Sequence, residues 1–387
     1  MSKLFPHRAR PFVGHAAFAT NSHHTAPSQA ALLLHLGNQL RGTEATRAAR
    51  AGAAKRKSFV ASGPDDDFPV PTLRGFSGPV AYEDSRDRLK RNHGYELRAV
   101  PGAAQAEDAY AAAHRDCAAR LFEQPMAKHA ADLFAISLDH PFLLVRIAAA
   151  IASLPLSTRP AHNVRVLVQG LKSEDLLERT LAATGLARHH PEHAALRPLA
   201  RGKTAPLVKT KPETLLLVHG TWASDAAWYQ PNGDLFNFLQ GSRADLYSKS
   251  DYFKWSGGWS DGARFAGATE LQQWVVARNE AGLDLMGHSH GANIILKATT
   301  MGLTAGKAVL LSCPVHVDKY FPDFNQLKRP VQSVRVKHDL VILADGGGQQ
   351  FDHPDINELV LPIWFDHGAS HDPAVWQKNN VAGKIKL

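Results

Sequence analysis

The residues best suited to chemistry in this sequence are Gly287-His288-Ser289-His290-Gly291, which lie between an apolar run and a segment with helical periodicity. A serine at a sharp strand-to-helix turn is held with its hydroxyl exposed above the sheet, at the positive end of the helix dipole. Glycines suit this turn because neighbouring backbone comes too close for a side chain. The pattern therefore predicts that Ser289 is a nucleophile, rather than an incidental serine at a glycine-rich helix start.

Short apolar runs alternate with helical segments from residue 213 onward. The runs are 215–218, 283–286, 308–311, 331–336 and 359–365, and the helical segments include 264–278 and 291–301. This alternation predicts an α/β domain with a mostly parallel sheet covered by helices on both faces. Active groups of such sheets collect at the carboxyl ends of the strands. The polar candidate residues of this sequence follow the runs at those ends.

A second motif makes the resemblance to a known family specific. Leu217-Val218-His219-Gly220-Thr221-Trp222 is similar to the His-Gly turn of the α/β-hydrolase superfamily, and residues 213–387 resemble a serine esterase or lipase of that group. The resemblance implies an oxyanion hole built from backbone N–H groups. One donor is the N–H of His290, and the other comes from Thr221 or Trp222, between which the sequence does not decide. The other interpretation of His219-Gly220 is a strand-end turn with a structural histidine.

The acid of a Ser–Asp–His triad should follow the next-but-one strand after the serine, since the family's chain order is serine, acid, histidine. Asp339 lies there, three residues beyond the run 331–336. Asp345 is the alternative, although it precedes a glycine-rich stretch that resembles a separate loop. We expect Asp339 to be the acid.

The base should come from the loop after the last strand, where two histidines compete. We expect His371 to be the base because it directly precedes a helix start with Asp372 as N-cap and Pro373 in the first turn. His367, nearer the strand end, is the alternative base. Together with Asp366 these residues also suggest a metal site, but they lack the helical i,i+4 spacing and the distant third ligand of such sites. We expect no metal and no cofactor.

Aromatic residues near these motifs are candidates for a substrate pocket. Trp255 belongs to an aromatic and glycine-rich stretch, 252–260, that either walls a pocket or packs under the next helix. His316 and Phe321 belong to the stretch 314–324, which is the best candidate for a pocket rim. Few residues separate Ser289, Asp339 and His371, so the sequence predicts no large lid domain between them.

The first 212 residues carry a different composition. Residues 1–80 are predicted to be a basic, poorly ordered segment, residues 81–202 an α-helical region, and residues 203–212 a linker before the hydrolase-like domain 213–387. Two helical stretches of the second region, 143–150 and 176–183, match at a shift of 33 residues. Such self-similarity is typical of HEAT-type helical repeats. An ordinary helical bundle is the alternative.

The net charge of +8 belongs to the N-terminal segment alone. Residues 1–60 hold nine Lys and Arg and one acid, so the rest of the 44 basic and 36 acidic residues balance. We therefore expect no nucleic-acid partner, while weak contact with an anionic membrane surface stays open. There is no apolar run of about 18 residues that could span a membrane and no recognisable signal peptide. With two distant cysteines, these features predict a cytoplasmic protein.

These observations together predict a serine hydrolase that cleaves a small-molecule or lipid ester. The near alternative is a lipid-active lipase, phospholipase or thioesterase, because the same triad supports all of these reactions. The distant alternative is an interaction protein that uses the helical region and keeps the other domain as a scaffold. The identity of the ester is left open by the sequence, as is any protein partner of the helical region.

Overall fold

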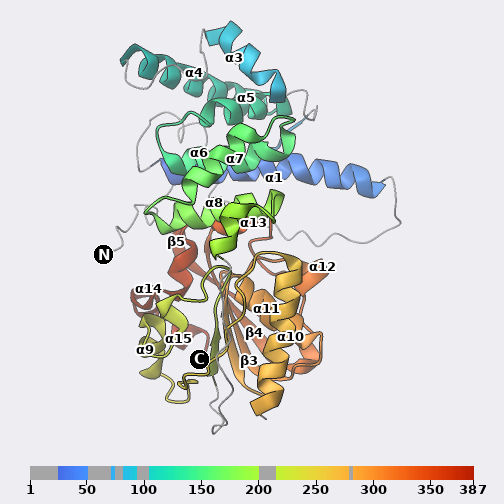
Figure 1. Cartoon of the computed structure of the whole chain (residues 1–387), viewed down its shortest axis with the longest axis vertical. Coiled ribbons are helices and arrows are strands. Elements are labelled where there is room, and N and C mark those ends of the chain that lie inside the picture. Colours follow the sequence, from blue (N-terminus) through green and yellow to red (C-terminus); the bar gives the residue numbers. More distant parts are fainter. Residues whose placement is uncertain (1–24, 51–70, 75–81, 94–103, 200–214, 279–281) are drawn as a thin grey trace. The chain divides into compact units, whose positions relative to one another are not determined.

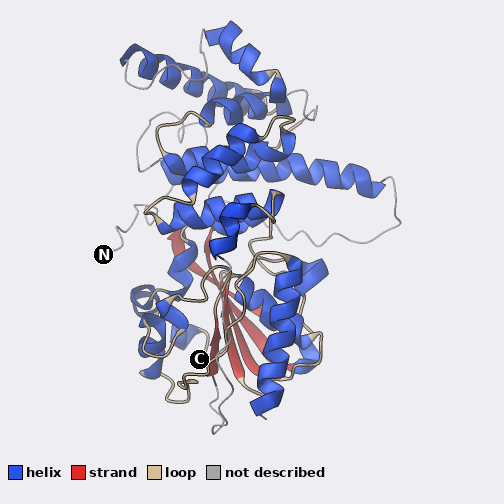
Figure 2. Cartoon of the chain, viewed as in Figure 1, coloured by secondary structure: helices blue, strands red, loops and turns tan. Residues whose placement is uncertain are grey.

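The computed structural model describes residues 25–50, 71–74, 82–93, 104–199, 215–278 and 282–387 (Figure 1). The chain divides into two compact units. The helical unit contains the described residues up to His190 together with residues 343–346. The sheet unit contains the other described residues from 191 onward, including all the described strands (Figure 2). The linker predicted over 203–212 lies outside the described residues.

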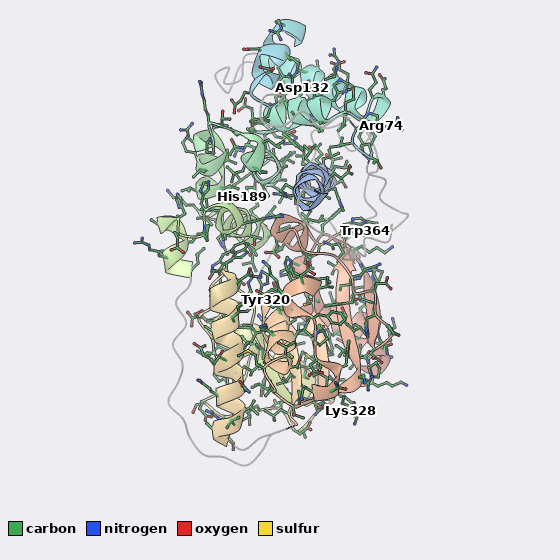
Figure 3. All side chains as sticks on the ribbon, turned by 90° about the vertical axis from the view of Figure 1, so that its right-hand side faces the viewer. Arg74, Asp132, His189, Tyr320, Lys328 and Trp364 are labelled. Atoms are coloured by element: carbon green, nitrogen blue, oxygen red, sulfur yellow. The ribbon has the colours of Figure 1, made fainter. Side chains whose placement is uncertain are left out.

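A parallel sheet forms the centre of the sheet unit. Its described strands lie side by side in chain order: β1 (Leu215–Val218), β2 (Asp284–His288), β3 (Ala305–Leu311), β4 (Leu327–Lys337) and β5 (Ile356–Trp364). In Figure 3, Lys328 near the start of β4 marks the amino ends of the strands, and Trp364 at the end of β5 marks their carboxyl ends. These two sides of the sheet are called its amino edge and its carboxyl edge. All five apolar runs in the sequence became strands, which confirms the predicted α/β architecture.

Strand β1 is buried on both faces, which explains why its sequence is apolar without alternation. In β1, Leu216 and Val218 pack into one core, and Leu215 and Leu217 pack into the other. Helices α10 (Asp261–Arg278) and α11 (His290–Thr299) cover the first face. The second face is covered by α9 (Asp234–Gln240), α14 (Pro373–Asn379) and α15 (Val381–Lys384) (Figure 1).

The direction in which the chain adds to the sheet reverses between β1 and β2. After β1 and α9, the backbone of Leu246 pairs in parallel with Leu215 on the side of β1 away from β2, and the Tyr247 N–H donates to the Leu215 carbonyl at 2.8 Å. The chain then crosses through α10 on the other face to reach β2. In open α/β sheets, ligands bind outside the carboxyl ends of the strands at such a point of reversal.

A buried ion pair fixes the segment after Leu246 to α10. The side chains of Arg278 and Asp251 are each 2% exposed and lie 2.7 Å apart. The Tyr247 hydroxyl donates to Asp251 at 2.8 Å and accepts from Arg278 at 3.3 Å, and the Arg278 guanidinium lies 4.0 Å from the centre of the Trp274 ring. Removing one partner of such a buried pair costs about 3–5 kcal/mol, because the other charge stays buried without compensation.

Short helices complete the sheet unit at the ends of the strands. They are η4 (Ala194–Leu199), η5 (Ala227–Tyr229), α12 (Val317–Tyr320), η6 (Phe324–Gln326), α13 (Leu340–Asp345) and η7 (His367–His371). Of these, α13 follows β4 and η7 follows β5, so both begin at the carboxyl edge of the sheet. The last residues of α13 belong to the helical unit.

The helical unit consists of consecutive helices that pack against one another. They are α1 (Ala26–Arg50), α3 (Ser85–His93), α4 (Ala104–Glu123), α5 (Ala127–Ser137), α6 (Leu143–Ser153), η3 (Leu154–Leu156), α7 (Ala161–Gly170) and α8 (Leu176–His189). Among the described residues, no helix combines the length and the apolar character needed to cross a membrane.

Helix α1 lies within residues 1–80, the segment that the sequence predicts to be basic and poorly ordered. Its residues from Ala30 to Leu34 are fully buried, and it crosses α6 so closely that a Cβ on Gly37 would lie 2.8 Å from Ala152 Cα. The basic residues before 25 and over 51–60 lie outside the described residues.

The shift of 33 residues has a structural counterpart, because it aligns Leu143 with Leu176, the first residues of α6 and α8. Consecutive helices pack together here, as in a repeat. However, α1 also packs against α6 although it is distant in sequence, which a chain of nearest-neighbour repeats would not produce. The HEAT-like repeat therefore stays a prediction.

The helical unit should lose stability in mild acid because two neutral histidines are buried in it. His114 and His140 are 1% and 0% exposed, with ring centres 5.3 Å apart. Burial lowers the pKa of His114 to about 3 and that of His140 to about 2, with further lowering by the nearby positive charge of Arg115 and of Arg146. The stability is fully present above the unfolded pKa of 6.5, and each histidine should remove about 1.4 kcal/mol per pH unit below it.

Thermal unfolding of the full chain, followed by far-ultraviolet circular dichroism between pH 7.5 and 5, measures this loss. The variant His114→Gln, which cannot take up the proton, should show a shallower decline of unfolding temperature with falling pH. His129→Gln, on the exposed surface of the same unit, is the control and should decline like the wild type. Identical slopes for His114→Gln and the wild type would contradict the role of His114.

Candidate active site

Ser289 occupies a sharp turn between β2 and α11. Its backbone has φ 54° and ψ −129°, a conformation that costs a non-glycine residue of the order of 1–3 kcal/mol. The flanking glycines are required by close backbone contacts. A Cβ on Gly287 would lie 2.7 Å from Ala292 N, and one on Gly291 would lie 2.3 Å from the carbonyl oxygen of His219. The turn thus has the form that the sequence predicts for a nucleophilic serine.

Asp339 lies at the carboxyl end of β4 and is fully buried. One carboxylate oxygen, Oδ1, accepts the N–H groups of Val341 and Ile342 at 3.0 and 3.2 Å, so the residue caps the first turn of α13. The Gln349 side chain holds its backbone, since Oε1 accepts the Asp339 N–H at 2.9 Å and Nε2 donates to the Asp339 carbonyl at 3.3 Å. These contacts fix the second oxygen, Oδ2, in one direction.

The histidine that meets this carboxylate is His367. Its Nδ1 lies 2.8 Å from Asp339 Oδ2, and both side chains are buried. A carboxylate only accepts, so Nδ1 carries the proton and Nε2 is left as the basic nitrogen. The expectation that Asp339 would pair with His371 is therefore wrong, and the pair forms with the alternative histidine.

His371 has a different environment. It stacks on Trp228 with ring centres 4.6 Å apart and planes inclined by 15°, and its ring meets that of His288 edge-on at 4.5 Å. Burial and the neighbouring His367 lower its pKa to about 4. The predicted helix start beside it is confirmed, because Asp372 Oδ1 accepts the Ala374 N–H at 2.8 Å. His371 thus packs between Trp228 and His288, and its ring is neutral at neutral pH.

His288 is a site residue that the sequence alone did not single out. It is 6% exposed, and its Nε2 lies 3.2 Å from the His367 carbonyl oxygen. Since that oxygen accepts, Nε2 carries the proton, and the residue before Ser289 holds the backbone of the residue that pairs with Asp339. Burial, followed by the nearby His371 and His367, lowers the pKa of His288 well below its ordinary value. Only its position inside the serine motif could have indicated this role.

The turn after β1 lies against Ser289, because a Cβ on Gly220 would be 3.0 Å from Ser289 Cβ. The structure discriminates between the two oxyanion candidates of this turn. The Trp222 N–H donates to the Gly257 carbonyl at 2.9 Å and is therefore engaged. The Thr221 N–H makes no hydrogen bond to another described residue. His290, the other candidate donor, is the first residue of α11.

His219 and Trp255 hold this turn through hydrogen bonds and ring stacking. His219 Nδ1 donates to the Gly220 carbonyl at 2.8 Å, its Nε2 accepts the Trp255 N–H at 3.3 Å, and burial lowers its pKa to about 4. Trp255 is 1% exposed, stacks on the His219 ring and donates from Nε1 to the His219 carbonyl at 2.8 Å. The prediction that Trp255 walls a pocket is therefore wrong, and it packs in the core.

The two other pocket candidates differ in position. His316 is half-buried, precedes α12, and lies so near Gly347 that a Cβ there would be 3.2 Å from its Nε2. Phe321 packs against Phe324 and His353, which lie just before β4 and β5 at the amino edge of the sheet. Because Ser289 is at the opposite edge, Phe321 does not belong to the site.

Asp345 was the alternative acid in the sequence. It ends α13 and belongs to the helical unit, where its charge acts on Arg188. Asp366, which the sequence also linked to a metal site, accepts the Gly368 N–H at 3.1 Å and begins η7. Among the described residues, no group of three or more His, Cys, Asp or Glu side chains is arranged to hold a metal ion.

The described residues thus place a strained serine and a buried Asp–His pair at the carboxyl ends of the strands of one sheet. In comparisons with protein-family models, curated proteins and solved structures, no family, protein or structure matches the chain.

Proposed function

We propose that this protein is a serine hydrolase that cleaves a carboxylic ester through an acyl-enzyme intermediate. The observation that carries the proposal is the 2.8 Å contact between the buried Asp339 carboxylate and His367, at the same sheet edge as the strained turn of Ser289. A serine hydroxyl becomes a nucleophile only when a base takes its proton, and the base must be oriented by a third group. Asp339 supplies that orientation to His367.

In the proposed mechanism His367 Nε2 accepts the proton of the Ser289 hydroxyl as its oxygen attacks the ester carbonyl carbon. The imidazolium that forms keeps its Nδ1–H on Asp339, whose negative charge stabilises it. The N–H groups of Thr221 and His290 bind the oxyanion, and such donors act mainly on the transition state. Collapse of the tetrahedral intermediate returns the proton to the leaving alcohol. Water activated by the same histidine then hydrolyses the acyl-enzyme.

The serine itself gives the direct test. Ser289→Ala should abolish hydrolysis of short p-nitrophenyl esters by the full chain, because the proposed acyl-enzyme forms on the Ser289 oxygen. Ser312→Ala is a matched control. Ser312 directly follows the neighbouring strand β3, is fully buried, and its hydroxyl has no partner among the described residues. The control should hydrolyse esters like the wild type.

A wild-type protein that hydrolyses none of these esters, or a Ser289→Ala variant as active as the wild type, would contradict the proposal. A panel of esters, thioesters and phospholipids of graded acyl length extends the measurement. The panel decides between a small-ester hydrolase and the lipase, phospholipase and thioesterase alternatives.

A further inference from the structure

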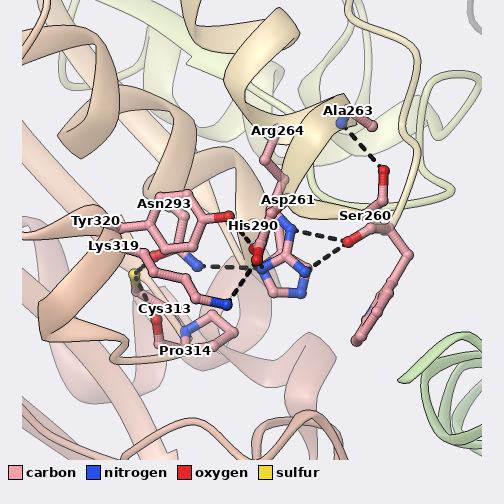
Figure 4. A network of polar contacts seen from close by, with 11 residues as sticks. Ser260, Asp261, Ala263, Arg264, His290, Asn293, Cys313, Pro314, Lys319 and Tyr320 are labelled. Atoms are coloured by element: carbon pink, nitrogen blue, oxygen red, sulfur yellow. Dashed lines mark hydrogen bonds and ion pairs between the residues drawn. The ribbon is translucent and has the colours of Figure 1, made fainter. Parts of the chain in front are cut away.

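An arginine is buried directly behind the turn of the candidate nucleophile. Arg264 lies in the first turn of α10 and is 3% exposed. Its Nε and Nη2 donate to the Trp259 carbonyl at 2.8 and 2.5 Å, and its Nη1 lies 3.3 Å from His290 Nδ1 (Figure 4). Within the described part of the chain, Arg264 makes no hydrogen bond to Ser289, His367 or Asp339. It does contact His290, the residue that follows Ser289.

The contacts of Arg264 define the state of the His290 ring. Arginine can only donate, so His290 Nδ1 accepts, and the Asn293 side-chain amide donates to the same nitrogen at 3.0 Å. Asn293 is itself oriented, because its Oδ1 accepts the Cys313 thiol at 3.2 Å. The ring is therefore held by two donors at one nitrogen, and the guanidinium charge is held against the first residue of α11.

This placement of charge is unfavourable for the helix alone. The N-terminus of a helix carries partial positive charge and favours an anion, whereas Arg264 adds a cation there. The carboxylate of Asp261 lies close to this network, with Oδ1 3.7 Å from Arg264 Nη1. Asp261 is already engaged, since Lys319 Nζ lies 2.6 Å from its Oδ2 and the Tyr320 hydroxyl donates to its Oδ1 (Figure 4). Arg264 thus places a buried guanidinium beside His290, the first residue of α11.

We propose that Arg264 is a positioning residue whose buried charge, placed behind His290, stabilises the oxyanion that forms at Ser289. The proposal rests on the proposed ester hydrolysis. A fixed positive charge in a water-poor site stabilises negative charge that develops during the reaction and leaves a neutral ester substrate almost unaffected. The Arg264 charge opposes the dipole of α11 in the resting protein, but it attracts the negative charge of the oxyanion in the transition state.

Charge substitution tests the proposal. Arg264→Gln should lower kcat for p-nitrophenyl acetate about 10- to 100-fold, somewhat less than the loss of a direct oxyanion donor, while KM changes little. Arg264→Lys keeps the charge and loses the forked contact with Trp259, and it should restore most of kcat. Inhibition by phenylboronic acid, which forms a tetrahedral anion on a catalytic serine, should weaken in parallel with kcat in the Gln variant and stay near the wild-type level in the Lys variant.

Arg278→Gln is the matched control, because Arg278 is a second buried arginine on the same helix and lies in the network of Asp251. It should lower the unfolding temperature and leave kcat per folded molecule unchanged. Equal losses of kcat in Arg264→Lys and Arg264→Gln would overturn the proposal, since they would show that the forked contact matters and the charge does not. If Arg264→Gln does not fold, the test uses Arg264→Lys alone. Loss of boronic acid inhibition in this variant would overturn the proposal, because the charge is kept and the inhibition is lost.

Failure of this proposal is distinguishable from failure of the proposed function. A wild-type chain that hydrolyses esters and loses activity in Ser289→Ala, together with an unchanged kcat in Arg264→Gln, would reject only the role of Arg264. A wild-type chain that hydrolyses no ester would reject the hydrolase itself.

Discussion

Replacement of His367 by glutamine should lower kcat/KM for ester hydrolysis about 10³-fold or more, whereas replacement of His371 by phenylalanine should change it only a few-fold. His367 is the histidine bonded to Asp339, at 2.8 Å, and glutamine cannot serve as a base. His371 instead stacks on Trp228. Phenylalanine preserves that stacking, so His371→Phe removes the imidazole nitrogens while keeping the packing.

Steady-state kinetics with p-nitrophenyl acetate measures both variants, and thermal unfolding of each confirms that it is folded. An inactive His371→Phe beside an active His367→Gln would show that the histidine paired in the fold is not the base. It would then assign the base to the histidine that the sequence favoured.

Asp339→Asn should lower kcat about 10³- to 10⁴-fold with little change in stability. Asparagine is as good an N-cap as aspartate, so Oδ1 can still accept the N–H groups of Val341 and Ile342. In the Asp339→Asn variant an amide NH₂ group takes the place of the carboxylate oxygen that accepts from His367 Nδ1. Two donors then face each other, and no hydrogen bond forms between them. The imidazole then loses both its orientation and the negative charge that stabilises its protonated form.

The matched control is Asp372→Asn, which changes the N-cap of α14 in the same way. Its activity should remain close to that of the wild type. The measurement is kcat together with the unfolding temperature for both variants. A large drop in the unfolding temperature of Asp339→Asn would indicate that its lost activity comes from misfolding, and wild-type activity would contradict the role of Asp339 as the orienting acid.

Local patterns were sufficient to predict the sheet and part of the site. Apolar runs became parallel strands because a hydrophobic core covers each face of the sheet, and the glycines around Ser289 were informative because each meets backbone at contact distance. Asp339 was predictable from its place in the chain order, directly after β4. These features depend on spacing along the chain, which the sequence contains.

Other features depend on contacts between distant segments and were not predictable. His367 and His371 lie four residues apart at the two ends of η7, and only the fold reveals that the first faces Asp339 and the second faces Trp228. The engagement of the Trp222 N–H by Gly257 is another such contact. Phe321 was misplaced because the chain runs from the carboxyl edge to the amino edge of the sheet between β3 and β4.

The central claim is that Ser289 is the nucleophile, and covalent labelling tests it most directly. The full-length protein is treated with a fluorophosphonate probe, digested, and analysed by tandem mass spectrometry to locate the modified residue. We predict a single adduct on Ser289 that is lost in Ser289→Ala and strongly reduced in His367→Gln. Absence of any adduct on the folded wild-type protein, or an adduct on a different residue, would contradict the claim.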